Sequence, residues 1–353
     1  MTTSTNRRQT HDHVVLAHGG GGELMSRLIR DHLVGPLAND TLTALTDGAV
    51  LPWPAGDLVL TTDSYVVTPL EFPGGDIGRL AVAGTVNDLA VMGAEPVALS
   101  LGLIIEEGLP LATLDRIVAT IAATAREAGV SIVTGDTKVI DRRRSGQTGE
   151  ATLESGLFIN TAGVGRRRPD ARLAIDRVGP GDVILVNGNL ADHGLTVMSV
   201  RAGIAFESDL RTDAAPLNGL IAALLDSGAD VRFLRDATRG GLAGVLADIS
   251  EGTGHSVEID EERIPVSPTA RHAAEMLGLD PLTVANEGKV IGVVAANDAD
   301  RALAAWRGHP LGRQAAVIGR VCQSQPPLVE LLTRAGGRRI VQRPYGEELP
   351  RIC

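Results

Sequence analysis

The sequence contains few aromatic residues, few cysteines and no long apolar run. Aromatic residues make up 2% of its 353 residues, so any core must be built from Ala, Val, Leu and Ile. Two cysteines, Cys322 and Cys353, exclude a disulfide framework and a multi-cysteine metal site. No apolar segment approaches the length that spans a bilayer, and the start of the chain lacks the apolar region of a secretory signal. We therefore expect a reduced, cytoplasmic protein.

The charge balance limits the kinds of partner. The formal net charge of −10 at pH 7 argues against a surface that binds nucleic acid or an anionic membrane. It does not exclude a nucleotide, because metal ions bridge carboxylates to phosphates. The content of 44% hydrophobic and 22% charged residues is typical of a folded soluble protein.

Strand-like and helix-like segments alternate along the chain and predict two domains that each contain helices and strands. The first pattern includes an amphipathic helix over 109–128, which Gly129 ends. A second pattern begins after the basic residues 166–168. We therefore expect a disordered lead-in over 1–13, a first domain over 14–170, a second domain over 171–342 and a flexible tail over 343–353. Fully extended, the tail would span roughly 35 Å.

Two glycine-rich turns, at 19–22 and 240–241, each precede a predicted helix. Backbone amides at such a turn can bind phosphate, although ordinary flexible turns have the same composition. No G-x-x-x-x-G-K-[ST] segment is present, which excludes a P-loop. The eight histidines show no metal-ligand spacing, and we expect most of them to be surface or packing residues.

Five aspartates lie at predicted strand ends, turns or helix starts: Asp47, Asp63, Asp88, Asp136 and Asp236. Mg²⁺ takes oxygen ligands and commonly bridges carboxylates to phosphates. Aspartate is also a favoured cap and turn residue, so each one alone is a weak indication. Several of them acting together predict an acid-lined nucleotide site.

Only two of the 33 basic residues are lysines, Lys138 and Lys289. Where arginine is preferred so strongly, a lysine suggests a site that needs a compact ammonium group rather than a planar guanidinium. Each lysine lies in a segment that also carries glycine and an acidic residue. The alternative, that both are ordinary surface lysines, stays open.

The last residue of the sequence is Cys353. Two cysteines in 353 residues place one at this position by chance about once in 180 chains. Prenylation of the C-a-a-X type needs a cysteine four residues from the end and is excluded. A thiol on an extended tail is suited to carrying a covalently bound group between sites. Cys322, inside a predicted strand, is instead expected to be a small buried hydrophobe.

These motifs together resemble the aminoimidazole-ribonucleotide-synthetase-like (PurM-like) superfamily of ATP-binding proteins. The resemblance covers nearly the whole chain past residue 13 and rests on HGGGGE (18–23), TTDS (61–64), NDLAVMG (87–93), GDTK (135–138), RDATRGG (235–241) and NEGK (286–289). The closing PRIC (350–353) is similar to the signature of one branch, the carbamoyl dehydratases of hydrogenase maturation.

The resemblance implies a two-domain α+β fold. The sheet of the N-terminal domain would pair with a second subunit into a homodimer, and the C-terminal domain would be an α/β sandwich. ATP and Mg²⁺ would lie in the cleft between the domains. The residues implied to bind ATP are Gly19, Gly20, Gly21, Gly22, Asp63, Asn87, Asp88, Asp136 and Thr137, and those implied to bind the metal are Asp47, Asp63, Asp88 and Asp236.

The implied reaction is an ATP-dependent dehydration of a carbamoyl group on Cys353 to a cyano group, which supplies cyanide to the iron of [NiFe]-hydrogenase. Lys138 is expected to offset charge on the transferring phosphoryl group, and Glu287 to remove N–H protons, with Asp88 or Asp136 in reserve. The implied partners are a carbamoyltransferase that loads Cys353 and a maturation scaffold complex that accepts the cyano group.

Other functions remain open from the sequence. A selenophosphate synthetase shares the ATP cleft, but that family has a catalytic Cys or selenocysteine near the N-terminal glycine turn, and residues 14–24 contain none. A thiamine-monophosphate kinase would give Cys353 no role. A non-catalytic ATP-binding scaffold would use the terminal thiol only to tether a partner.

Overall fold

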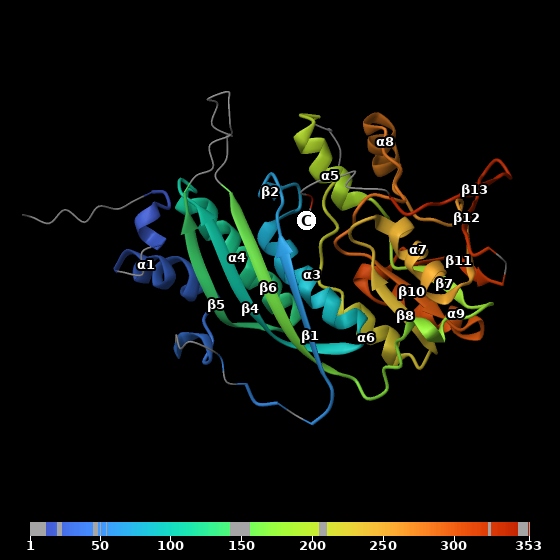
Figure 1. Ribbon diagram of the computed structural model, residues 1–353, viewed down its shortest axis with the longest axis horizontal. Helices are drawn as coiled ribbons and strands as arrows, with labels where there is room; N and C mark the ends of the chain where they lie inside the picture. Colours follow the sequence, from blue (N-terminus) through green and yellow to red (C-terminus); the bar gives the residue numbers. More distant parts are fainter. Residues whose placement is uncertain are drawn as a thin grey trace, which may run out of the picture.

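A computed structural model of the chain describes residues 12–19, 23–44, 49, 51–53, 55–141, 156–204, 210–323, 326–344 and 352. The predicted site residues Gly20, Gly21, Gly22, Asp47 and Cys353 lie outside this set. The described residues form two large sheets, each with its own helices (Figure 1). No helix among them is long and apolar enough to cross a membrane.

The first domain consists of short N-terminal helices, a sheet and two long helices. Its helices are η1 (Leu16–Gly19), α1 (Glu23–Leu28), η2 (Ile29–Val34), α2 (Gly35–Leu37), η3 (Leu42–Ala44), α3 (Ile77–Val91) and α4 (Leu111–Ala128). Its strands are β1 (Leu58–Tyr65), β2 (Glu71–Phe72), β3 (Gly75–Asp76), β4 (Ala94–Glu106), β5 (Ser131–Ile140) and β6 (Leu157–Arg167).

The main sheet of this domain has the strand order β1-β6-β4-β5. Strand β6 runs antiparallel to β1 and β4, whereas β5 runs parallel to β4, which requires a crossover through α4. Helix α4 is the predicted amphipathic helix. It buries Leu114, Ile117 and Ile121, and it ends at Gly129, whose φ of 72° is the left-handed C-cap conformation.

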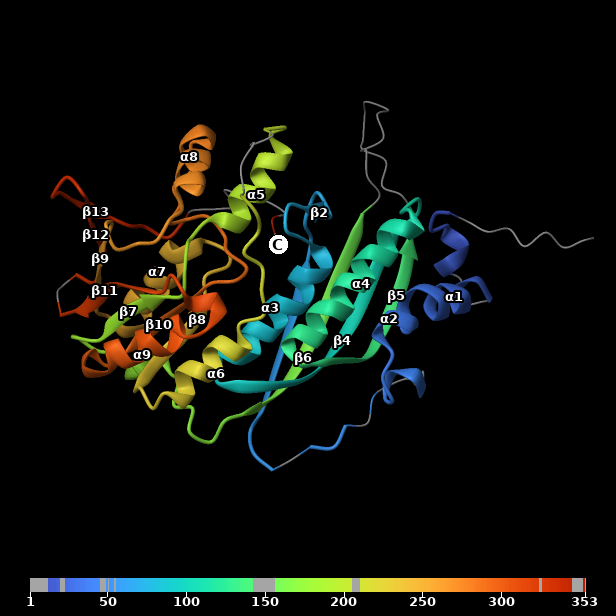
Figure 2. The ribbon, with the colours of Figure 1, turned by 180° about the vertical axis from the view of Figure 1, so that it is seen from behind.

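One face of the sheet is covered by α3 and α4 and the other is not (Figures 1 and 2). Leu60 on β1 is 67% exposed and Ile104 on β4 is 43% exposed on the uncovered face. Such a patch of exposed apolar side chains is unusual for a single chain. The pairing of this sheet with a second copy stays a prediction.

The second domain is a mixed sheet with helices on both faces. Its strands are β7 (Val183–Val186), β8 (Val231–Asp236), β9 (Ser256–Asp260), β10 (Val290–Val294), β11 (Ala316–Cys322), β12 (Val329–Leu332) and β13 (Arg338–Ile340), in the order β13-β12-β9-β11-β7-β10-β8. Its helices are η4 (Ile175–Arg177), α5 (Asp192–Arg201), α6 (Asn218–Asp226), α7 (Gly241–Thr253), α8 (Pro268–Leu277), η5 (Ala296–Asp298), α9 (Ala299–Arg307) and η6 (Pro310–Gly312).

The alternation of side chains along β10 explains the two layers of helices. Ile291 and Val293 belong to the apolar cluster that includes α7, whereas Val290 and Val294 belong to the cluster that includes α6 and α9. All five residues of β10 are buried, as is typical of a central strand covered on both faces. Cys322, at the end of β11, is half-buried rather than fully buried as predicted.

Described residues near the two ends of the chain make defined contacts. Residues 12 and 13 were expected in a disordered lead-in, yet the backbone N–H of Leu111 donates to the carbonyl of Asp12 at 3.0 Å. Ile352 was expected in a flexible tail, but it is 3% exposed. It belongs to the core cluster of the first domain, together with Val197 and Ala214 of the second domain.

Candidate active site between the domains

Acidic side chains from both domains meet where helix α3 faces the second domain. Strand β1 places Asp63 on its α3 face, since the hydroxyl of Tyr65 lies 3.2 Å from the Asp63 carboxylate and 3.3 Å from Thr85 on α3. Asp88 on α3 accepts a hydrogen bond from Thr61 at 2.8 Å. Asp236 ends β8 and pairs with Val290, three residues after Glu287.

We define the acid cluster as Asp63, Asp88, Asp236 and Glu287. Burial, and then neighbouring carboxylates, raise the pKa of three of its members, Asp88, Asp236 and Glu287. Burial raises the pKa of Asp88 to about 7, and Asp236 and Asp63 add to the shift. Burial also raises the pKa of Asp236, and Asp63 adds to the effect. Neighbouring groups therefore do not fully neutralise the negative charge of the cluster. This favours the binding of a cation there.

Mg²⁺ fits the chemistry of this cluster, because its donors are carboxylate oxygens. Of the four ligands that the sequence predicted, Asp63, Asp88 and Asp236 belong to the acid cluster, and the fourth, Asp47, lies outside the described residues. No group of three or more acidic, His or Cys side chains within the described part is arranged to hold a metal ion. The described residues thus provide suitable donor atoms but not a complete set of metal ligands.

Glu287 is the most buried carboxyl group of the acid cluster. Its side chain is 3% exposed, and Oε1 has no hydrogen-bond partner among the described residues. Burial raises its pKa well above the usual value, and Asp236, Asp213 and Asp63 raise it further. An unpaired buried acid is costly, which makes Glu287 a candidate functional residue.

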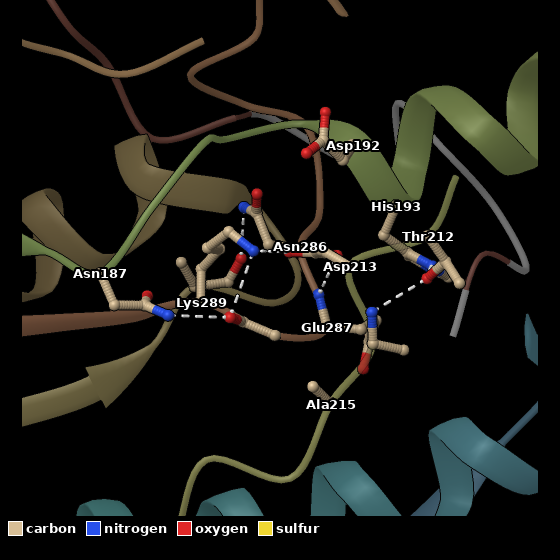
Figure 3. Close-up of polar contacts among 12 residues, drawn as sticks. Asn187, Asp192, His193, Thr212, Asp213, Ala215, Asn286, Glu287 and Lys289 are labelled. Atoms are coloured by element: carbon tan, nitrogen blue, oxygen red, sulfur yellow. Dashed lines mark hydrogen bonds and ion pairs between the residues drawn. The ribbon is translucent and has the colours of Figure 1, made fainter. Parts of the chain in front are cut away.

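A buried ion pair supports the loop that carries Glu287 (Figure 3). Lys289 Nζ lies 2.8 Å from Asp213 Oδ2, and Asp213 Oδ1 accepts the backbone N–H of Glu287 at 3.1 Å. Burial alone would raise the pKa of Asp213, but Lys289 holds it below its usual value. Lys289 therefore neutralises Asp213, and Asp213 in turn positions the backbone of Glu287. The role that the structure gives to Lys289 is structural support of this loop.

Close packing fixes the same loop. A side-chain carbon on Gly288 would lie 1.9 Å from the carbonyl oxygen of Asp213, so only glycine fits. Asn286 donates to the carbonyl of Ala237 at 2.8 Å and accepts from the backbone N–H of Ala191 at 2.8 Å. The loop is thus tied to strand β8 and to the start of α5.

Asn87 joins the two domains. It is 2% exposed, and its amide donates to the carbonyl oxygens of Ala215 at 3.2 Å and Glu287 at 3.4 Å. Its oxygen accepts the backbone N–H of Leu217 at 2.7 Å. These contacts give Asn87 a structural role, and its predicted contact with ATP stays a prediction.

Asp136 and Lys138 do not join the acid cluster. Along the sheet, Asp63 shares a row with Thr161, Leu101 and Gly135, and it faces α3. Asp136 is one residue further along β5 and therefore faces the uncovered side. Three strand spacings also separate β1 from β5, or about 14 Å.

On the uncovered side, Asp136 and Lys138 form an exposed ion pair. Lys138 Nζ lies 2.7 Å from Asp136 Oδ2, with side-chain exposures of 64% and 67%. The hydrogen bond from Lys138 holds the pKa of Asp136 below its usual value. Lys138 therefore lies at the surface of the single chain and not in the acid cluster.

A cavity of about 510 Å³ lies next to Asp136, Thr137 and Lys138, below the N-terminal helices. Its apolar wall includes Ile29 and Leu101. Helix α1, which follows the predicted glycine turn, forms one side through Met25 and Ser26. The predicted ATP residues therefore fall into two groups in one chain, the acid cluster between the domains and this cavity at the edge strand.

The sequence did not identify several residues at the site. His193 was grouped with histidines of no special role, yet it is fully buried and contacts the tail: its Nε2 lies 2.8 Å from the carbonyl oxygen of Ile352. Tyr65 and Asp213 were also missed. Their importance depends on burial and on neighbours distant in sequence, so no local pattern marks them.

Comparisons with known proteins agree with this architecture. Residues 45–166 match the family model "AIR synthase related protein, N-terminal domain", and residues 179–329 match its C-terminal counterpart. The chain is 47% identical over 340 residues to the carbamoyl dehydratase HypE of Azotobacter vinelandii, covering 96% of this chain and 97% of that protein.

Solved structures are similar along the whole fold. A crystal structure of the hydrogenase maturation protein HypE in complex with ATP is 43% identical, with a TM-score of 0.89 and coverage of 96% of this chain and 99% of that one. A HypE chain in a HypE–HypF complex is 43% identical, with a TM-score of 0.76 and coverage of 92% and 100%. The predicted family and two-domain fold are confirmed, and the chain belongs to the HypE carbamoyl dehydratases of hydrogenase maturation, within the AIR synthase-related proteins.

Proposed function

We propose that the chain uses ATP to dehydrate a carbamoyl group carried on Cys353 and so makes the cyano group for the iron of [NiFe]-hydrogenase. The observation that carries this proposal is the position of the tail. Ile352, next to Cys353, is buried against His193, and His193 contacts Thr212. The following residue, Asp213, holds the backbone of Glu287. The thiol-bearing end of the chain is thereby linked to the acid cluster.

The relatives support the same activity and its substrates. The similar proteins are named carbamoyl dehydratases, and one similar structure contains ATP. We extend ATP binding to this chain because the acid cluster and the cavity at β5 supply donors for phosphate-bound Mg²⁺ and an apolar wall for a base.

The reaction balances without an oxidant or reductant. The carbamoyl oxygen of Cys353 attacks the γ-phosphorus of ATP, ADP leaves, and the C–O bond then breaks to release phosphate. Two N–H protons depart, so that S–C(=O)–NH₂ becomes S–C≡N and the elements of water leave within phosphate. Activation by ATP is needed because an amide oxygen is a poor leaving group.

Glu287 is the proposed base for an N–H proton. Burial, and then the neighbouring carboxylates, raise the pKa of its carboxyl group well above the usual value in the free protein. A cation held by Asp63, Asp88 and Asp236 would remove the repulsion from these neighbours and lower the pKa of Glu287 toward the range of a base. Bound Mg²⁺ would supply charge neutralisation for the transferring phosphoryl group.

The chain forms a homodimer through the uncovered sheet face in this proposal. Leu60 and Ile104 supply apolar area there, and Asp136 and Lys138 lie on the same face. A second copy packed on this face would place its own Lys138 against the uncovered face of the first. We propose that the two groups of predicted ATP residues, which one chain keeps apart, act together in the dimer.

Partners follow from the chemistry of the tail. A carbamoyltransferase must load Cys353. The solved HypE–HypF complex supports the expectation that a protein of this family binds another maturation protein. A maturation scaffold complex would accept the cyano group. The need for a free thiol at Cys353 also favours the reducing cytoplasm.

The test uses the full chain with Cys353 carbamoylated beforehand. We expect Mg·ATP to cause loss of one water from the C-terminal peptide in mass spectra, with one ADP formed per cyano group. A non-catalytic scaffold whose thiol only tethers a partner would show no such loss. A selenophosphate synthetase would consume ATP without any change at Cys353. Either result would contradict the proposal.

A further inference from the structure

The penultimate residue of the chain is held by one buried imidazole. The carbonyl oxygen of Ile352 lies 2.8 Å from His193 Nε2, and both residues are almost fully buried, at 3% and 0% exposure. The bond joins residues 159 positions apart in the sequence. It therefore fixes the backbone immediately before Cys353 to the start of α5.

The protonation of His193 follows from its two partners. The Ile352 carbonyl can only accept, so Nε2 carries the proton and donates. Burial lowers the pKa of His193 and keeps the ring neutral, which leaves Nδ1 as an acceptor. Thr212 Oγ1 lies 2.8 Å from Nδ1 and must donate its hydroxyl proton there, while its lone pair accepts the backbone N–H of Ala214 at 3.1 Å. Every group in this chain of hydrogen bonds is satisfied.

The imidazole ring is fixed by packing as well. Phe72 lies against it in an edge-on arrangement, with ring centroids 5.5 Å apart and planes at 75°. Ala191, two residues earlier, has a φ of 75°, which is a strained conformation for a residue other than glycine. Asn286 accepts the backbone N–H of Ala191 and helps to hold this conformation.

Two routes connect His193 to Glu287 (Figure 3). Along one route, Thr212 contacts the ring, and its neighbour Asp213 accepts the backbone N–H of Glu287. Along the other, Asn286, the residue before Glu287, binds the start of α5 through Ala191. The position of the tail carbonyl is thus set relative to Glu287 by hydrogen bonds on both sides.

We propose that His193 is a positioning residue that latches the tail at Ile352 and so presents the modified Cys353 to the acid cluster. The inference rests on the proposed dehydration at Cys353 and adds a residue that acts on the tail rather than on the reacting atoms. Ile352 supplies the apolar contact, and its hydrogen bond with His193 fixes the orientation of the backbone at Ile352.

The latch has opposite effects on the two steps that Cys353 undergoes. Loading by a carbamoyltransferase needs the tail released, whereas dehydration needs it docked. Weakening the latch should therefore leave loading unchanged or faster and make dehydration slower. A residue needed only for folding would slow both steps together.

The experiment compares His193→Leu, which removes both hydrogen bonds at similar volume, with His193→Gln, which retains a donor and an acceptor. His272→Leu, on the exposed face of α8, is the matched control. Alkylation of Cys353 by iodoacetamide reports release of the tail, and Cys322 is the internal reference in the same chain.

For His193→Leu we expect Cys353 alkylation to rise and dehydration of the pre-carbamoylated chain to fall, each by about three- to tenfold. This is the effect of losing the one hydrogen bond that holds Ile352. His193→Gln should restore much of both, and the rates for Cys322 and His272→Leu should not change. Equal slowing of loading and dehydration, or unchanged alkylation of Cys353, would overturn the proposal.

A second variant and the alkylation rates test the latch in two further situations. If His193→Leu does not fold, Thr212→Val replaces it, with Thr212→Ser as its conservative partner, and the same changes are expected. If wild-type protein fails to dehydrate, the proposed function fails by itself. The alkylation rates then still decide whether His193 holds the tail.

Discussion

Lys289 and Asp213 form a buried ion pair, with Nζ 2.8 Å from Oδ2 and side-chain exposures of 11% and 5%. The pair contacts the backbone of the catalytic candidate Glu287, which belongs to the acid cluster. Its function is to allow a carboxylate to be buried where it can accept the backbone N–H of Glu287. Lys289 is therefore a support for the site.

Removing one member of this pair should destabilise the protein strongly. Lys289→Met leaves Asp213 charged and buried without a partner, and we expect the free energy of unfolding to fall by about 3–5 kcal/mol. The double variant Lys289→Met/Asp213→Asn should recover part of the loss, because no unpaired charge remains. Urea unfolding measures both, and a double variant less stable than Lys289→Met would contradict this account.

The raised pKa of Asp88 predicts how the stability of the free protein depends on pH. A carboxyl group with a pKa of about 7 in the fold, against 3.8 in the reference state, stabilises the fold fully at low pH. This stabilisation is lost as the pH rises from about 4 to about 7. Asp88→Asn should therefore stabilise the free protein at pH 8, on the order of 2 kcal/mol, and have little such effect at pH 4. A difference that does not grow with pH would refute the assigned cause.

Binding of Mg·ATP should release protons near neutral pH. A cation at Asp63, Asp88 and Asp236 favours the ionised carboxylates, so protons held by Asp88, whose pKa is raised to about 7, are expelled. Calorimetry in buffers of different ionisation enthalpy should show this release at pH 6.5, with a smaller release for Asp88→Asn. Chelation of Mg²⁺ should weaken ATP binding, and binding without proton release would contradict the metal assignment.

Mixing two inactive variants should restore activity if the site is shared between subunits. Lys138→Ala and Glu287→Gln should each abolish most dehydration. A mixed dimer retains one site with an intact Glu287 from one copy and an intact Lys138 from the other, so a statistical mixture should regain about a quarter of wild-type activity. The double variant mixed with itself is the control. No recovery on mixing would show that both residues act within one chain.

The uncovered face of the sheet should be the dimer contact. Leu60→Asp places a charge on this face at a residue that is 67% exposed in the single chain, so the subunit fold should survive. We expect light scattering to show monomers and dehydration to be lost with them. Thr43→Asp, on the exposed surface outside the sheet, is the control. A dimeric Leu60→Asp protein would place the contact elsewhere.

Removal of Cys353 should abolish the reaction without changing the stability of the fold. A chain that ends at Ile352 should keep the melting temperature of the wild type but carry no carbamoyl group and produce no cyano group. Cys322→Ser should load and react normally, because Cys322 only ends strand β11. Persistent cyano formation in the shortened chain would disprove the carrier role of the terminal thiol.

The sequence predicted those features that depend on local chemistry. The amphipathic pattern and Gly129 predicted helix α4 and its end, because side-chain spacing and the left-handed C-cap are properties of neighbouring residues. The motifs around Asp63, Asp88, Asp236 and Glu287 also predicted an acid-lined site, and the structure brings these four residues to one place. The residues that would complete the metal site, such as Asp47, lie outside the described part.

Other features depend on strand order and burial, which the sequence does not contain. Asp63 and Asp136 both belong to strands that carry site motifs, yet a one-residue difference in register places them on opposite faces of the sheet. Lys138 follows Asp136 to the uncovered face for the same reason. The sequence treated them as one site, and the fold separates them within a chain.

The sequence by itself determined the family, the two domains, the acidic motifs and the thiol of Cys353. Each of these can be recognised from short stretches of neighbouring residues. Only the tertiary structure decided that His193 holds Ile352 and that Lys289 neutralises Asp213. Both contacts join segments far apart in the chain, and their strength comes from the exclusion of water at the place where those segments meet.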